Sequence, residues 1–133
     1  MGSIGKQLYY WNSNHSPRTM VKKVDFISAA GFLDGGDARE KLGLDGGPRI
    51  VVSNLAVMDF HPDSKKMRLQ SVHPGITVEN VQNATGFELL LPEGSVPETK
   101  PPNQEQVRLI REVIDPDEMR KRELRRADGT SAR

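Results

Sequence analysis

The sequence predicts an α/β fold built on an open, mostly parallel sheet, and three segments support this prediction. The run Pro48–Phe60 is almost continuously apolar, which is typical of a strand buried on both faces of a parallel sheet. The segment Met67–His73 alternates with the period-2 pattern of a half-exposed strand, so we expect it to form a hairpin with the preceding strand. Thr77–Gly86 carries the start and stop signals of a helix.

The amino-terminal part adds two predicted strands. Gln7–Trp11 is short and rich in aromatic residues that favour strands. Thr19–Ser28 is expected to form an amphipathic strand with Val24 and Phe26 on one side. Neither apolar surface has a partner nearby in the sequence, so both are candidate contact surfaces.

A glycine-rich segment precedes the main predicted strand. It contains Leu-Asp-Gly-Gly twice, at Leu33–Gly36 and at Leu44–Gly47. Between the two copies, Asp37–Leu44 is expected to form a single helical turn. Gly43 would end this turn, because glycine readily adopts the left-handed conformation that follows many helices.

The helix after Met67–His73 has clear boundary signals. Thr77 is placed to accept a hydrogen bond from the backbone amide of Glu79 or Asn80 as an N-cap. Gly86 ends the helix, and the apolar segment Phe87–Leu91 is expected to be a further strand.

The carboxyl-terminal third is rich in proline and charge. Asn103 and Gln106 form a predicted capping box. An apolar stripe follows them, and Asp115 is expected to cap a second helix whose first residue is Pro116. We therefore predict a domain over residues 1–115 and a charged tail, helical or disordered, over residues 116–133.

The composition narrows the classes of function. The chain has 133 residues, with 19 basic and 18 acidic side chains and a formal net charge of +1, so no global field attracts nucleic acid or an anionic membrane. It has no cysteine, which excludes disulfides and favours a reducing cytoplasm. No apolar run approaches the roughly 20 residues that a membrane span needs. We expect a cytoplasmic protein that binds neither nucleic acid nor membrane.

The two glycine pairs are the first candidate binding residues: Gly35, Gly36, Gly46 and Gly47. They match neither a P-loop, which ends in Gly-Lys-Ser/Thr, nor a G-x-G-x-x-G dinucleotide loop. On residue types alone, plain turns explain them, since glycine permits positive φ and close backbone approach. The alternative is a pair of loops that bring backbone amides near the phosphates of a ligand.

Two polar residues are further candidates. Asn54 interrupts the predicted buried strand, so it either ties neighbouring strands together or faces a pocket. His73 stands at the end of a strand, just before a helix, where the active sites of parallel sheets lie. No histidine pair has metal-ligand spacing, and no serine, histidine or carboxylate set has the pattern of a catalytic motif, so we predict no metal site and no catalytic residue.

Together these segments resemble a known family. VKKVDFISAAGFLDGGDAREKLGLDGGPRIVVSNLAVMDF, from Val21 to Phe60, and MRLQSVHPGITVENVQNATGFEL, from Met67 to Leu89, are similar to the C-terminal half of the β subunit of family I coenzyme A transferases. The resemblance is to the glutaconate CoA-transferase type of β subunit, including the related steroid-ring-cleaving CoA hydrolases. It extends over about residues 16–114.

The resemblance implies a fold and a chemistry. The fold is the open α/β sheet shared by CoA transferases and sugar-phosphate isomerases, here as a partial domain. The partner is an α subunit, with the active site at the interface, and the substrate is CoA or acyl-CoA with no permanently bound cofactor. In the transferases a β-subunit glutamate attacks the acyl-CoA, and glycine-loop amides help to bind CoA. The resemblance thus implies CoA-binding roles for the two glycine pairs. Asn54 and His73, proposed from their positions in the sequence, are expected to contribute to the same binding site.

The sequence departs from the family in one respect. A complete β subunit is nearly twice as long, and its nucleophilic glutamate lies in the half that this sequence lacks. Four glutamates of this chain lie outside the family's catalytic position, so none of them inherits the nucleophile's role: Glu40, Glu79, Glu88 and Glu93. Whether the chain is an enzyme subunit or a non-catalytic protein-interaction module therefore stays open. Whether the reaction is CoA transfer or hydrolysis also stays open. We expect the chain to associate with an α subunit or with a second copy of itself.

Overall fold

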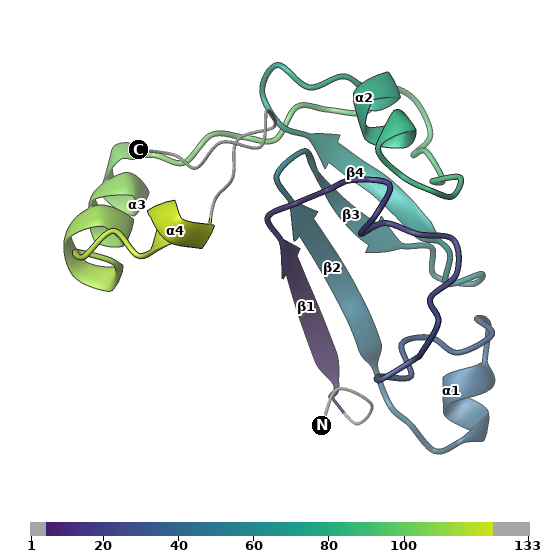
Figure 1. The fold of residues 1–133 in the computed structure, drawn as a ribbon. Coiled ribbons are helices and arrows are strands. Elements are labelled where there is room, and N and C mark those ends of the chain that lie inside the picture. Colours follow the sequence, from purple (N-terminus) through teal and green to yellow (C-terminus); the bar gives the residue numbers. More distant parts are fainter. Residues whose placement is uncertain (1–4, 124–133) are drawn as a thin grey trace. The chain divides into compact units, whose positions relative to one another are not determined.

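The computed structural model describes residues 5–123, and its sheet has four strands in the order β1-β2-β3-β4 (Figure 1). The strands are β1 (Gln7–Asn12), β2 (Gly47–Ser53), β3 (Ala56–Phe60) and β4 (Met67–Val72). β1 runs parallel to β2, whereas β2 with β3 and β3 with β4 are antiparallel. The α/β class and the open sheet are confirmed. Within the described residues the sheet is mixed, so the prediction that it is mostly parallel is wrong.

The apolar run Pro48–Phe60 forms two strands rather than the single strand expected. The chain reverses at Asn54 and Leu55, and β3 returns alongside β2 with Val52 opposite Val57. The Ser53 hydroxyl stabilises the reversal, because it accepts hydrogen bonds from the backbone amides of Leu55 and Ala56, both at 3.1 Å. A short polar side chain that bonds to the backbone two or three residues further on favours a turn over a continued strand.

Residues 5–123 contain five helical segments, several of which begin or end at local signals in the sequence. They are α1 (Ala38–Lys41), α2 (Val78–Asn83), α3 (Gln104–Arg108), the π-helical turn η1 (Leu109–Ile114) and α4 (Arg120–Glu123). Thr77 caps α2 by accepting from the Asn80 amide at 3.1 Å. Asn103 and Gln106 form the predicted capping box of α3. Gly43 follows α1 with a φ of 68°, as expected for the residue that ends it.

Three predicted elements are absent or displaced. Thr19–Ser28 contains no strand, and Phe87–Leu91 contributes only an isolated parallel bridge between Leu90 and Arg68. Both predictions are therefore wrong. Asp115 does not cap a helix that begins at Pro116. A turn intervenes, and the Asp115 carboxylate accepts from the amides of Met119 at 2.6 Å and Arg120 at 3.0 Å, where α4 begins.

The core lies on one face of the sheet. The strand register places Val51 beside Met58, and Met58 beside Leu69. Val81 of α2 is fully buried against this face. Burial of such side chains is worth roughly 1.5–3 kcal/mol each, so this layer is the main source of stability. Among residues 5–123, the buried apolar set is Met20, Val51, Ala56, Met58, Leu69, Val72, Val81 and Leu89.

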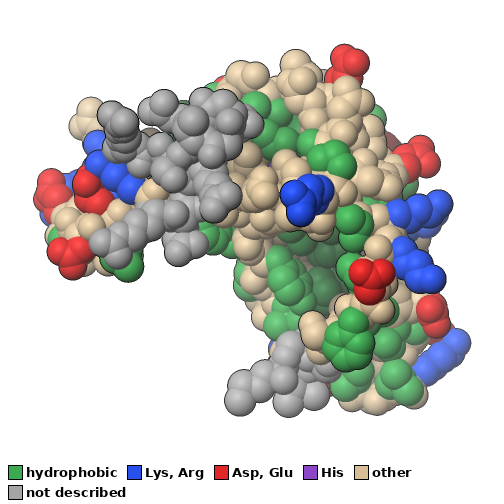
Figure 2. All heavy atoms as spheres, viewed as in Figure 1, with side chains coloured by type: hydrophobic (Ala, Val, Ile, Leu, Met, Phe, Trp, Pro, Cys, Tyr) green, Lys and Arg blue, Asp and Glu red, His purple; other side chains and the backbone are tan. Residues whose placement is uncertain are grey.

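The opposite face of the sheet is largely uncovered by residues 5–99. Tyr9 pairs with Ile50 and Trp11 with Val52, so these four side chains share that face. Tyr9 is 62% exposed and Trp11 is 58% exposed. Figure 2 shows the other side of the sheet, on which the loop after β1 crosses β3 and β4, and apolar side chains are also visible there over the region of β1 and β2. The Val24 and Phe26 side chains are also exposed, although no strand carries them.

The chain divides into two units, Met1–Thr99 and Lys100–Arg133. The first contains the sheet with α1 and α2, and the second contains α3, η1 and α4. The predicted boundary after residue 115 stays a prediction, and the predicted tail lies partly outside the described residues. No helix of the described chain combines the length and the apolar character needed to cross a membrane.

Candidate functional site

The glycine pairs lie where the segment around α1 meets the start of β2 (Figure 1). All four have positive φ: 86° at Gly35, 52° at Gly36, 65° at Gly46 and 135° at Gly47. A Cβ atom on Gly46 would lie 1.9 Å from the Lys6 carbonyl oxygen, a distance that no real side chain tolerates. Close backbone approach therefore requires glycine at position 46, and left-handed backbone favours it at the others.

Arg39 connects the two loops. Its side chain is buried and donates to the carbonyl oxygens of Gly31 at 2.7 Å, Gly46 at 2.9 Å and Asp45 at 3.2 Å. Because the guanidinium group presents several donors in a fixed plane, it holds the two backbone segments at a set separation. A cavity of about 220 Å³ beside Arg39 is lined by Gly36 and Gly46, among others.

Asn54 and His73 lie at the opposite end of β2. The Asn54 side-chain oxygen accepts from the His15 amide at 2.7 Å, so it ties the turn to an earlier loop. His73 Nε2 lies 2.9 Å from the Ser53 carbonyl oxygen, and its Nδ1 lies 3.1 Å from Thr99 Oγ1. Both residues thus have structural hydrogen bonds between segments that are far apart in the sequence.

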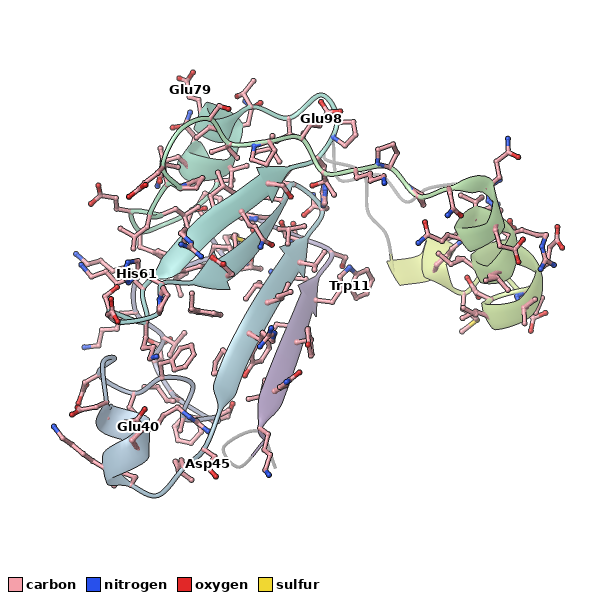
Figure 3. The ribbon with its side chains drawn as sticks, turned by 180° about the vertical axis from the view of Figure 1, so that it is seen from behind. Trp11, Glu40, Asp45, His61, Glu79 and Glu98 are labelled. Carbon is pink, nitrogen blue, oxygen red and sulfur yellow. The ribbon has the colours of Figure 1, made fainter. Side chains whose placement is uncertain are left out.

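The six predicted binding residues therefore form two separate groups. In Figure 3, Asp45 and Glu40 mark the glycine end, whereas Glu98, which precedes the Thr99 partner of His73, lies at the other end. β2 has seven residues, and a strand rises about 3.3 Å per residue. The groups are thus separated by roughly 20 Å, and the structure does not combine them into one small site.

A buried polar cluster at the Asn54 end is not predicted by the sequence. His15 is 5% exposed, and its Nδ1 lies 2.9 Å from Ser53 Oγ while its Nε2 lies 2.9 Å from Thr85 Oγ1. Burial lowers the pKa of His15, because desolvation disfavours the charged imidazolium. The neutral ring therefore acts as a hydrogen-bonding link between the first loop, β2 and the end of α2.

The described residues contain no obvious catalytic set. The side chains of Glu40, Glu79, Glu88 and Glu93 are exposed to solvent. Within residues 5–123, no group of three or more His, Asp or Glu side chains is placed to hold a metal ion. The clearest polar clusters are thus the glycine end and the His15 cluster.

The chain is similar to proteins of known activity, although no family model matches it. The IpdB chain of the cholesterol ring-cleaving hydrolase of Mycobacterium tuberculosis is 39% identical over 123 residues, which cover 92% of this chain and 48% of that protein. The B subunit of glutaconate CoA-transferase from Acidaminococcus fermentans is 36% identical over 104 residues, which cover 77% of this chain and 38% of that protein.

Solved structures give the same result. The structure of IpdAB from Rhodococcus jostii superimposes with a TM-score of 0.77 and 34% identity, covering 92% of this chain and 48% of the matched one. Glutaconate CoA-transferase from A. fermentans matches with a TM-score of 0.71 and 32% identity, covering 85% of this chain and 42% of that one. The decarboxylase AibA/AibB shares the fold, with a TM-score of 0.61 and 21% identity.

The chain spans about half the length of the curated relatives it matches. Over that half, most of this chain resembles the relatives in both sequence and fold. The chain is therefore homologous to the B subunits of CoA-transferases and of the IpdB ring-cleaving hydrolases, over about half of their length.

Proposed function

We propose that this chain forms part of the B subunit of a two-subunit enzyme that acts on acyl-CoA compounds, by CoA transfer to a carboxylic acid or by the related hydrolysis. The observation that carries this proposal is the match to the R. jostii IpdAB structure, at a TM-score of 0.77 over 92% of this chain. The relatives named as CoA-transferases supply the reaction class.

The glycine end is the part of the chain that we assign to CoA. Among residues 5–123, no protein atom accepts a hydrogen bond from the backbone amide of Gly36 or Gly46. Both residues line the cavity of about 220 Å³. Arg39 and Lys65 also line this cavity. Backbone amides that have no protein acceptor and lie beside cationic side chains suit the phosphates of CoA, because both attract anionic oxygen atoms.

Asn54 and His73 have a different place in the proposal. Their hydrogen bonds hold the turn between β2 and β3 and the segment around Thr99. CoA is a long molecule, so one end of it can lie at the glycine loops while its thioester end lies far from them. We propose that Asn54 and His73 shape the end of the sheet where the reacting groups meet, rather than the CoA phosphates.

The catalytic carboxylate and the partner come from outside this sequence. The candidate glutamates here are exposed and do not contact the His15 cluster, so none of them is assigned the role of nucleophile. The exposed face of β1 is the proposed contact surface for an A-type subunit or a second copy. Isolated, the chain is expected to exchange no acyl groups between a CoA ester and a free acid.

A hybrid subunit tests the proposal. In R. jostii IpdB, the 123 residues that match this chain at 38% identity are replaced by it, and the hybrid is co-expressed with IpdA. We expect a soluble complex with ring-cleaving activity, whereas IpdB lacking the matched residues gives neither. A folded hybrid complex without activity, together with unchanged Gly35, Gly36, Gly46 and Gly47 amide signals when CoA is titrated, would instead identify a non-catalytic interaction module.

A further inference from the structure

A second cavity, of about 370 Å³, lies beside the glycine end and is lined by cations. Its charged side chains are Arg49, Lys65, Arg68 and Asp59. Arg68 forms a two-bond ion pair with Asp59, with Nε–Oδ1 at 2.9 Å and Nη2–Oδ2 at 2.6 Å. Neither Arg49 nor Lys65 forms an ion pair with a described residue. This cavity, here called the cationic hollow, therefore carries two positive charges that its own carboxylate does not neutralise.

Lys65 is held in place at the hollow rather than extended into solvent. It is half-buried, its ammonium group donates to the Pro62 carbonyl oxygen, and the same group lies 5.7 Å from the centroid of the Phe32 ring. Its φ is 58°, a left-handed conformation that is uncommon outside glycine. A cation fixed over an aromatic ring retains its charge while losing part of its hydration, which strengthens its attraction to an anion.

Aromatic side chains form another wall of the hollow. Phe32 and Phe60 pack edge to face, with ring centroids 5.0 Å apart and an interplanar angle of 66°. His61 completes this side, and its Nδ1 accepts from the amides of Asp63 and Ser64 at 3.3 Å each. Flat apolar surface beside cations is the combination that binds a nucleobase together with its phosphates.

The hollow is continuous in composition with the glycine end. Phe32 and Lys65 line both the cationic hollow and the smaller cavity that contains Gly36 and Gly46. An extended anionic ligand can therefore contact the glycine amides and the cations at once. This continuity distinguishes the hollow from an isolated group of surface lysines and arginines.

From this arrangement we propose that the cationic hollow binds the phosphorylated adenosine end of CoA, with Arg49 and Lys65 contacting phosphate oxygens and Phe32 contacting the base. The inference rests on the proposed function and adds to it the residues that recognise the nucleotide. Arg68 is the third cation, and its pairing with Asp59 fixes its direction. A free phosphate ion or the carboxylate of an acid substrate has part of the same chemistry, so the test compares all three.

The test measures affinity by amide NMR of the full isotope-labelled chain. The probes are 3′-phosphoadenosine 5′-phosphate, inorganic phosphate and glutarate at equal ionic strength. The variants are Arg49→Gln and Lys65→Gln, and the matched control is Lys66→Gln, since Lys66 is exposed and does not line the hollow. We expect the nucleotide to bind most tightly, each hollow variant to weaken it about fivefold to tenfold, and Lys66→Gln to leave it unchanged.

Each other outcome has a distinct meaning. Equal affinity in Arg49→Gln, Lys65→Gln and the unmodified chain would overturn the proposal, as would tighter binding of glutarate or of phosphate than of the nucleotide. Amide chemical-shift changes confined to the glycine loops, with no effect of the two variants, would show that the hollow does not bind the nucleotide. The proposed function would be unaffected. Nucleotide binding at the hollow together with an inactive hybrid subunit would contradict the proposed function. The hollow would then still be a nucleotide-binding site.

Discussion

His15 and Ser53 are 38 residues apart in the sequence, yet His15 Nδ1 lies 2.9 Å from Ser53 Oγ inside the fold. The other ring nitrogen lies 2.9 Å from Thr85 Oγ1, and that hydroxyl donates to the Val81 carbonyl oxygen at 2.7 Å. Thr85 then accepts from Nε2–H, and Nδ1 of the neutral ring can accept from the Ser53 hydroxyl, whose single hydrogen has the Ala56 carbonyl oxygen at 3.3 Å as its other acceptor. The cluster therefore suits the neutral imidazole, because a second ring proton on Nδ1 would need Ser53 Oγ as its acceptor, and that oxygen already accepts from two backbone amides.

Acid is therefore expected to destabilise the protein through His15. Burial lowers the pKa of His15 below its ordinary value of 6.5, so the unfolded chain binds a proton at a higher pH than the folded chain does. The contribution of His15 to stability is complete above about pH 6.5 and is lost as the pH falls below it, by at most ~1.4 kcal/mol per pH unit.

Urea unfolding at several pH values between about 7.5 and 5 measures this effect. His15→Gln is the comparison, because it keeps a side-chain amide and cannot titrate. The difference in free energy of unfolding between the two proteins should narrow as the pH falls. Parallel pH curves for the unmodified chain and the variant would contradict the assignment, since His61 and His73 remain in both.

The Ser53 hydroxyl is expected to matter for the β2–β3 turn. Ser53 is 3% exposed, and its Oγ accepts from the amides of Leu55 and Ala56 at 3.1 Å each. Ser53→Ala leaves these amides without that acceptor, at a cost of about 2 kcal/mol in the free energy of unfolding. Ser64→Ala is the control, because Ser64 is exposed, and it should change the value by less than about 0.5 kcal/mol. Equal effects of the two changes, measured by urea unfolding, would argue against the turn's dependence on Ser53.

The same turn explains why the prediction of a mostly parallel sheet is wrong. An apolar run such as Pro48–Phe60 indicates burial but does not specify chain direction. In the sequence, Ser53 and Asn54 look like polar interruptions of one strand, whereas their side chains bond to Leu55, Ala56 and His15 and reverse the chain. Once the run folds back on itself, two of the three strand pairings become antiparallel.

Local signals are more reliable than long-range ones in this chain. The caps at Thr77 and Asn103 and the helix end at Gly43 involve atoms within a few residues, so residue type and spacing suffice to predict them. The strand predicted over Thr19–Ser28 needs a neighbouring strand that the fold does not provide. Strand formation depends on such partners more than on propensity.

The candidate sites show the same limit. Both glycine pairs can be recognised from the sequence, because glycine at a turn is a local property. The sequence does not indicate that Asn54 and His73 lie at the other end of β2. Nor does it single out His15, whose partners Ser53 and Thr85 are 38 and 70 residues away. Only the serine and the asparagine inside the apolar run point to a polar cluster there.

Substitution of Gly46 should be far more damaging than substitution of Gly36. A Cβ on Gly46 would lie 1.9 Å from the Lys6 carbonyl oxygen, whereas a Cβ on Gly36 would meet no atom within 4 Å. In Gly36→Ala the alanine must adopt a left-handed backbone conformation, which lowers the free energy of unfolding by roughly 1–2 kcal/mol. In Gly46→Ala the backbone before β1 must also move away from the backbone before β2. We therefore expect the free energy of unfolding to fall by at least about 3 kcal/mol. Thermal or urea unfolding would measure both, and equal losses would show that the close approach at Gly46 relaxes readily.

The final prediction concerns association through the uncovered face of β1. Tyr9 and Trp11 are 62% and 58% exposed and share a sheet face with Ile50 and Val52. Apolar surface of this kind favours contact with another chain. We expect the isolated protein to self-associate at micromolar concentration in sedimentation experiments and to bind an apolar dye.

The double variant Tyr9→Thr, Trp11→Thr should weaken both the self-association and the dye binding, because threonine retains strand propensity while removing the aromatic surface. Leu42→Thr is the control, since Leu42 is 65% exposed but lies next to α1. A monomer that binds no dye, or equal effects of the control and the double variant, would show that this face is not the contact surface.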